Sequence, residues 1–212
     1  MKQQNISKEL FPDLEELMNI LMSDEEIRKI LPSLKTEDIP GIDLYMDQVT
    51  TFMEAQLGAS RRNESDKVLT KTMINNYAKN DLLPPPEKKK YSKEHLIIMI
   101  FIYYFKGFLS MQDIRFLLQP LSQEFFKSEE GPDITLLYDT ITKASLENLD
   151  CVSKDLRTFM HLAQSCFTDV PEEHRRQLQY FAMVCFLSMD ICIKKRVVEK
   201  MIDAVADTDN LK

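Results

Sequence analysis

The sequence has little glycine, no tryptophan and no long hydrophobic run. It contains only four glycines in 212 residues, whereas a β-sandwich needs turn residues at close intervals. The most apolar run, residues 96–105, is about half the length that a membrane-spanning helix requires. The first nine residues also lack the apolar core of a signal peptide. We therefore expect neither a β-sandwich, nor a membrane span, nor a secretory leader.

The cysteines and histidines show no metal-binding spacing. No CxxC pair is present, and the three histidines are scattered along the chain. Each cysteine lies in an apolar stretch with helical character, which favours buried thiols in a reducing cytoplasm. The four are Cys151, Cys166, Cys185 and Cys192. We expect no metal ion and no other cofactor.

The residues that are abundant (leucine, isoleucine, methionine, lysine and glutamate) favour helices. Apolar residues recur at helical spacing, and proline, glycine and capping sequences separate the segments. The predicted helices cover residues 12–22, 23–31, 42–57, 69–79, 92–106, 111–118, 134–149, 154–167 and 171–206. The aromatic and methionine side chains of 101–108 and 181–189 are expected to lie in the core.

The breaks divide the chain into three predicted parts. Residues 1–41 form an N-terminal helical segment, 42–120 a central unit, and 121–212 a C-terminal helical bundle. After the prolines at 84–86, residues 87–91 have room for only a small β-arm. The expected fold class is therefore all-α with at most that arm.

Positive charge is concentrated in an otherwise acidic chain. The formal net charge is −7, yet residues 59–106 carry ten Lys or Arg against five acids. The segment is thus +5 and the remainder −12. A net acidic protein does not coat nucleic acid over its whole surface, but a local basic site remains possible.

If the arm folds as a hairpin, helices 42–57 and 69–79 with the arm make a winged helix-turn-helix. Helix 69–79 would enter the major groove of double-stranded DNA, and the arm would meet phosphates. Asparagine recognises adenine and threonine contacts the thymine methyl group. The candidate DNA-binding residues are Arg61, Arg62, Lys67, Lys71, Thr72, Asn75, Asn76, Lys79, Lys88, Lys89, Lys90, Tyr91 and Lys93. The alternative is a lysine-rich surface that is merely solvated.

The order of short motifs over residues 43–118 resembles the DNA-binding domain of MerR-type transcription regulators. The matching stretches are Met73–Tyr77, Asp81–Pro84, Lys89–Tyr91, Gly107–Ile114 and Leu117–Leu118. This resemblance implies a winged helix-turn-helix. Four positions depart from the pattern. Asn75 replaces an arginine and Asn76 replaces the first aromatic residue. Asp81 replaces a turn glycine, and Leu109 is an extra residue. The whole arrangement is also similar to the YkrK-like family, a domain-of-unknown-function group from Gram-positive bacteria.

These features favour a cytoplasmic, sequence-specific transcription regulator. No glycine-rich phosphate loop or catalytic triad can be assigned, so we do not expect an enzyme. A homodimer is expected because one small reading unit covers few base pairs, with 14–22 or 184–198 as the interface. An unknown apolar effector that binds between the C-terminal helices is left open as a further partner. The rival interpretation is a non-enzymatic helical adaptor that binds proteins.

Overall fold

The computed structural model describes residues 11–23, 26, 34–128 and 131–209. This part of the chain is mostly helical and has one two-stranded sheet, which confirms the all-α prediction. The predicted helix at 23–31 lies largely outside the described residues. The chain forms two compact units: unit 1 comprises 1–27 and 147–197, and unit 2 comprises 28–146 and 198–212. The predicted boundaries after residues 41 and 120 both lie within unit 2.

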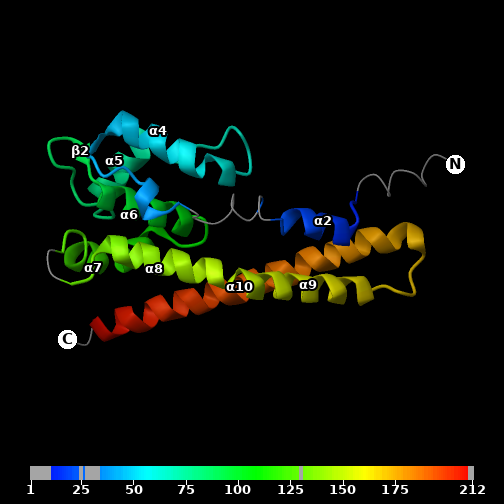
Figure 1. The fold of residues 1–212 in the computed structure, drawn as a ribbon. Helices are drawn as coiled ribbons and strands as arrows, with labels where there is room; N and C mark the ends of the chain where they lie inside the picture. Colours follow the sequence, from blue (N-terminus) through cyan, green and yellow to red (C-terminus); the bar gives the residue numbers. More distant parts are fainter. Residues whose placement is uncertain (1–10, 24–25, 27–33, 129–130, 210–212) are drawn as a thin grey trace. The chain divides into compact units, whose positions relative to one another are not determined.

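Unit 1 is built from α2 (Leu14–Leu21), α9 (Leu149–Ser165) and residues 172–197 of α10 (Glu172–Asp209). The Asp13 carboxylate accepts backbone N–H bonds from the first turn of α2, as an N-cap residue does. The buried side chains come from all three helices; they are Leu14, Met18, Met160, Ala163, Ala182 and Met183. Figure 1 shows α9 and the first part of α10 side by side. The apolar face of α2 is therefore used inside unit 1.

Several side chains that were predicted to be buried are exposed on α9 and α10. Cys151 and Cys192 are exposed free thiols, and the other two cysteines are only half-buried. Phe181 and Met189 are each 64% exposed. The prediction was wrong because the buried side chains of α10 in unit 1, Ala182 and Met183, occupy only part of its circumference. The apolar character of α10 extends beyond the face that packs.

Unit 2 is organised around α6 (Lys93–Phe105), whose side chains from His95 to Ile100 are all buried. Around this helix lie α4 (Met46–Leu57), α5 (Lys71–Lys79), α7 (Met111–Glu124) and α8 (Ile134–Glu147). Their apolar side chains form one cluster with those of α6. A helix that is apolar on all sides requires such a central place, as the run at 96–105 predicted.

The first residues of the predicted helix 42–57 are extended instead. Leu44 and Tyr45 form strand β1, which pairs antiparallel with β2 (Lys90–Tyr91), and α4 begins only at Met46. Leu44 lies opposite Tyr91. A strand pairing between residues distant in sequence overrides the local helical pattern here. The Tyr45 N–H donates to the Gln48 side chain at 2.9 Å, which marks the start of α4. Short 3-10 helices at Thr36–Asp38 and Gly58–Ser60 complete the unit.

Helix α7 is longer than predicted and continues through Pro120 to Glu124. Its start matches the prediction: Ser110 and Asp113 exchange side-chain and backbone hydrogen bonds in a capping box. Proline lacks an N–H donor and interrupts the helical ladder. Leu118 and Leu121 nevertheless pack on either side of Pro120 against the core of unit 2. This packing offsets the missing hydrogen bond.

Candidate nucleic-acid interface

One face of α5 is polar and exposed. The Thr70 hydroxyl accepts the N–H of Met73 at 3.2 Å and begins the helix, while Ile74 and Tyr77 point into the core. The exposed positions follow the spacing i, i+3, i+4, i+7, which places them on one side of a helix. They are Thr72, Asn75, Asn76 and Lys79, which we call the α5 face. It offers a hydroxyl, two amides and an ammonium group side by side.

The chain leaves α5 through a tight turn at Asp81. This residue has a left-handed backbone, with φ of 56°. The Leu82 N–H donates to the Tyr77 carbonyl at 2.9 Å, and the Asp81 N–H donates to the Ala78 carbonyl at 3.4 Å. These two bonds define a Schellman motif, in which glycine is the usual residue and aspartate is tolerated. The expected turn at Asp81 is confirmed, and buried Leu82 and Leu83 fix its direction.

The arm reverses at two consecutive lysines. Lys88 and Lys89 have φ of 50° and 65°, and the Lys90 N–H donates to the Glu87 carbonyl at 2.8 Å. Two left-handed central residues define a type I′ turn, for which Asn-Gly is the preferred pair. Non-glycine residues are strained in this conformation. The turn therefore holds two exposed ammonium groups at its tip at a cost in stability.

The base of the arm is fixed on several sides. Glu87 forms an ion pair with Lys127 at 2.8 Å, and the hydrogen bond and charge of Lys127 lower the pKa of Glu87. The Lys90 ammonium lies 5.1 Å from the centre of the Tyr45 ring, a cation–π contact. The Tyr91 ring packs edge-on against His95 at 5.5 Å. The tip is thus presented from an anchored base.

The arm and α5 meet at the beginning of α4. Lys71, in the first turn of α5, forms an ion pair with Asp47. Two residues earlier, Tyr45 carries Lys90 of the arm over its ring. The last residue of β1 therefore holds the base of the arm, and the first turn of α4 holds the start of α5. Predicted site residues far apart in sequence are brought together in this way.

Two predicted contact residues have structural roles instead. Tyr91 is 3% exposed and belongs to the core, so its ring is inaccessible to DNA. The guanidinium of Arg61 pairs with Glu54 at 2.5 Å and donates to the carbonyls of Gly58 and Asp66 at 2.9 Å each. These bonds hold the loop before α5. We therefore remove Tyr91 and Arg61 from the candidate interface.

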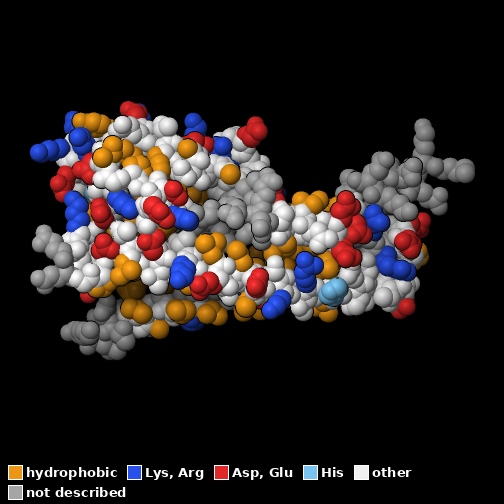
Figure 2. Space-filling view, viewed as in Figure 1, with side chains coloured by type: hydrophobic (Ala, Val, Ile, Leu, Met, Phe, Trp, Pro, Cys, Tyr) orange, Lys and Arg blue, Asp and Glu red, His pale blue; other side chains and the backbone are white. Residues whose placement is uncertain are grey.

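Most of the other predicted DNA-binding cations have no acidic partner among the described residues. Across the described parts of the chain, no ion pair is found for Arg62, Lys67, Lys79, Lys88, Lys89 or Lys93. Helix α5 carries no acidic residue, so its exposed face is not covered by carboxylates of its own. Figure 2 shows basic side chains at the border of the molecule where the arm lies in Figure 1.

Two lysines that matter for this region were not predicted from the sequence. Lys106 donates to the Val68 carbonyl at 2.9 Å and lies over the Tyr103 ring, and burial lowers its pKa. The Tyr103 hydroxyl also hydrogen-bonds Ser60 at 2.7 Å. Helix α6 thus holds both ends of the loop between α4 and α5. Lys127 was missed for the same reason as Lys106: its partner is distant in sequence.

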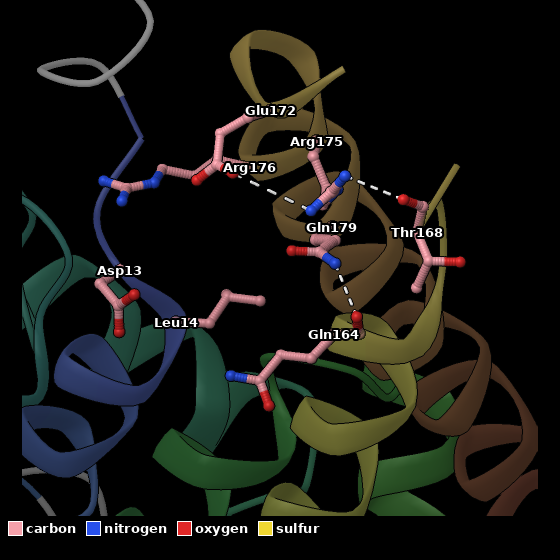
Figure 3. Close-up of a pocket in the computed structure, with 8 residues that line it drawn as sticks. All are labelled: Asp13, Leu14, Gln164, Thr168, Glu172, Arg175, Arg176 and Gln179. Atoms are coloured by element: carbon pink, nitrogen blue, oxygen red, sulfur yellow. Dashed lines mark hydrogen bonds and ion pairs between the residues drawn. The ribbon is translucent and has the colours of Figure 1, made fainter. Parts of the chain in front are cut away.

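Unit 1 has a polar pocket of about 360 Å³ (Figure 3). Its lining residues are Asp13, Leu14, Gln164, Thr168, Glu172, Arg175, Arg176 and Gln179. The Arg175 guanidinium donates to the Thr168 carbonyl at 2.8 Å, and the Gln179 amide donates to the Gln164 carbonyl at 2.6 Å. These bonds close the turn between α9 and α10. The lining is too polar for the expected apolar effector, which stays a prediction.

Two further kinds of feature are absent from the part of the chain that the structure describes. In the described ranges, no three His, Cys, Asp or Glu side chains come together in a way that would hold a metal ion. No helix within those ranges has both the length and the apolar character needed to cross a bilayer.

No curated protein and no solved structure matches the chain. A family model does match, at residues 34–141, and its description is "Domain of unknown function (DUF1836)". The match spans 108 of the 212 residues and includes α4, α5, the arm, α6 and α7. The candidate interface lies entirely within it. The chain therefore belongs to the DUF1836 family.

Proposed function

We propose that residues 42–120 form a winged helix-turn-helix that binds double-stranded DNA, and that the protein is a cytoplasmic, sequence-specific transcription regulator. The observation that carries this proposal is an exposed α5 face together with a strained turn of two exposed lysines. The start of α5 and the base of the arm contact neighbouring residues, Asp47 and Tyr45. A chain of net charge −7 gathers cations here although the turn would be more stable with other residues. Phosphate attraction explains why lysines occupy it.

In this proposal α5 reads the major groove. An α-helix fits that groove, and asparagine amides make paired hydrogen bonds to adenine. Asn75 and Asn76 supply amides, and Thr72 supplies a methyl group for thymine. Lys79 at the end of the helix and Arg62 in the preceding loop hold phosphates. The arm, with Lys88 and Lys89 at its tip, contacts the backbone beside the reading helix.

Salt-dependent binding tests the proposal directly. Fluorescence anisotropy with fragments from upstream of the protein's own coding region is measured at about 50 and 200 mM salt. With several phosphate contacts, affinity falls by orders of magnitude over this range. One fragment should be preferred over a scrambled sequence at both salt concentrations. If the folded protein binds no fragment at the lower salt concentration, this function is excluded.

Replacing Asn75 by alanine should weaken binding to the preferred fragment by about 10- to 100-fold, since a bidentate base contact contributes about 1–3 kcal/mol of discrimination. Binding to scrambled DNA should stay unchanged, because phosphates supply that affinity. Asn148→Ala is the matched control: this asparagine is also exposed and makes no side-chain capping bond. Equal losses on both DNAs would show that Asn75 does not read a base.

A non-enzymatic adaptor is the second candidate, and one observation favours it. Acidic residues of α4 neutralise two of the predicted DNA-binding cations: Asp47 pairs with Lys71, and Glu54 pairs with Arg61. A surface that has these charges paired is less attractive to phosphates and suits a protein partner. Asp47→Asn distinguishes the two. A DNA-binding protein should gain affinity when Lys71 is released, whereas an adaptor should still bind no DNA.

A further inference from the structure

The part of α10 in unit 1 is apolar on two opposite sides. One side packs in the core through Ala182 and Met183. The other side carries Phe181, Val184, Ser188 and Ile191, all exposed, which we call the α10 seam. Phe181 is 64% and Ile191 62% exposed. Surface helices normally show polar residues opposite the packed face, so the seam requires an occupant.

The spacing of the seam is that of a coiled coil. Its four residues follow one another at intervals of three, four and three, the a and d positions of two heptads. This pattern fits one other helix lying nearly parallel or antiparallel to α10. It does not fit an extended peptide, which would contact alternate positions of a strand or groove. The occupant is therefore a helix with a matching seam.

We infer that a second copy of the chain covers the seam, with the two α10 helices antiparallel and the axis of symmetry between Val184 and Ser188. In this alignment Phe181 faces Ile191 of the second copy, and Val184 faces the small Ser188. Each of these contacts occurs twice, as two-fold symmetry demands. The seam is thus complementary to itself, which is the property that selects a second copy over an unrelated helix.

Charge selects the antiparallel direction. Lys195 is the next position along the seam, four residues after Ile191. A parallel pair would place Lys195 against the same lysine of the second copy, and like charges in such positions repel. The antiparallel pair places it opposite Gln177. The opposed helix dipoles of an antiparallel pair are also favourable.

The other dimer interface predicted from the sequence, residues 14–22, has no free apolar face for a second copy. Leu14 and Met18, the apolar face of α2, are buried in the core of unit 1. The remaining exposed apolar residues of α2, Ile20 and Leu21, do not form a stripe of heptad length. Residues 184–198, the other predicted interface, overlap the seam.

A matched pair of substitutions tests the seam. Ile191→Glu places a carboxylate in each half of the interface and should raise the dimer dissociation constant at least 100-fold in sedimentation equilibrium. Ile193→Glu is the control: Ile193 is 65% exposed but lies on another side of the helix, so the constant should change less than about threefold. Both residues are exposed, and circular dichroism should show both variants folded. A wild-type monomer at 100 µM, or equal effects of the two variants, would overturn the inference.

Disulfide trapping tests the direction. In a background in which the four cysteines are serine, V184C combined with S188C should form a covalent dimer on mild oxidation with copper–phenanthroline. Each substitution alone should not, because identical positions lie about 6 Å apart along an antiparallel pair and the added separation between the helices exceeds disulfide range. Efficient cross-linking by either single variant would establish a parallel pair instead. Neither experiment involves DNA, so the outcomes are independent of the proposed function.

Discussion

Replacing Lys88 by Asn and Lys89 by Gly should stabilise the protein and weaken DNA binding at the same time. Both residues have a left-handed backbone, which costs an ordinary L-residue about 1–2 kcal/mol. Asn-Gly is the preferred pair in such a turn, so we expect a gain of about 1–2 kcal/mol in the free energy of unfolding. Removal of two phosphate contacts should lower DNA affinity by about 30-fold at 0.15 M salt and reduce the salt slope by about 1.8.

Two comparisons make this result specific. Lys88→Ala with Lys89→Ala removes the same charge but keeps a strained turn, so DNA affinity should fall equally without the gain in stability. Lys143→Ala with Lys154→Ala removes two exposed lysines from α8 and α9 and should change affinity little. Urea unfolding followed by circular dichroism and anisotropy at several salt concentrations provide the measurements. An Asn-Gly variant that binds DNA like the wild type would show that the arm does not touch phosphates.

Stability of unit 2 should fall as the pH is lowered below about 6.5 because of His95. This side chain is 2% exposed and packs edge-on between Tyr91 and Phe126, with ring centres 5.5 and 4.7 Å away. Its Nδ1 accepts the Ser92 N–H at 3.0 Å, which closes a capping box at the start of α6. Burial lowers the pKa of His95, and the Pro85 carbonyl opposes this effect only in part.

The direction of this pH dependence follows from the linkage between proton binding and folding. Because the folded-state pKa lies below the unfolded value of about 6.5, the unfolded chain binds the proton first as the pH falls. Stability from the neutral ring is fully present above pH 6.5 and is lost on acidification, with a slope that approaches about 1.4 kcal/mol per pH unit until the folded-state pKa is reached. Urea unfolding at pH 7.5, 6.5, 5.5 and 5.0 measures this loss of stability.

His95→Gln isolates this contribution. Glutamine is a usual residue at the third position of a capping box, so the hydrogen bond to Ser92 is retained. The ring packing is lost, and the variant should be about 1–2 kcal/mol less stable at pH 7.5. The difference in stability between the variant and the wild type should narrow as the pH falls, because only the wild type loses the contribution of the neutral ring. Carboxylates titrate in both proteins, so their effect cancels in this difference. A constant difference from pH 7.5 to 5.0 would mean that His95 does not cause the acid sensitivity.

Features fixed by neighbouring residues were predictable from the sequence. The Ser110 capping box, the turn at Asp81 and the end of α5 before Pro84 depend on contacts within a few residues, and each is found. The arm at 87–91 was predicted for the same reason. Its small size follows from the prolines before it and the helix after it.

Features fixed by distant partners were not predictable. The pairing of Leu44 with Tyr91 turned a predicted helix end into a strand. The burial of Tyr91 and the engagement of Arg61 with Glu54 removed two candidate DNA contacts. No local pattern distinguishes a tyrosine that faces solvent from one that faces the core, because this depends on what packs against the strand. The same holds for Phe181, whose helix buries only its opposite side in unit 1.

The contacts that fix both ends of the loop before α5 determine where the length of the chain is free to vary within this family. Ser60 is tied to Tyr103 and Val68 to Lys106, so the two points where the loop leaves and rejoins the scaffold are set independently of the residues between them. Once both ends are fixed, doubling a loop costs only about 0.6 kcal/mol of closure entropy. Arg61 also bonds the Asp66 carbonyl. Insertions and deletions between Asn63 and Asp66, inside the segment that these contacts close, should therefore accumulate among relatives without tilting α5.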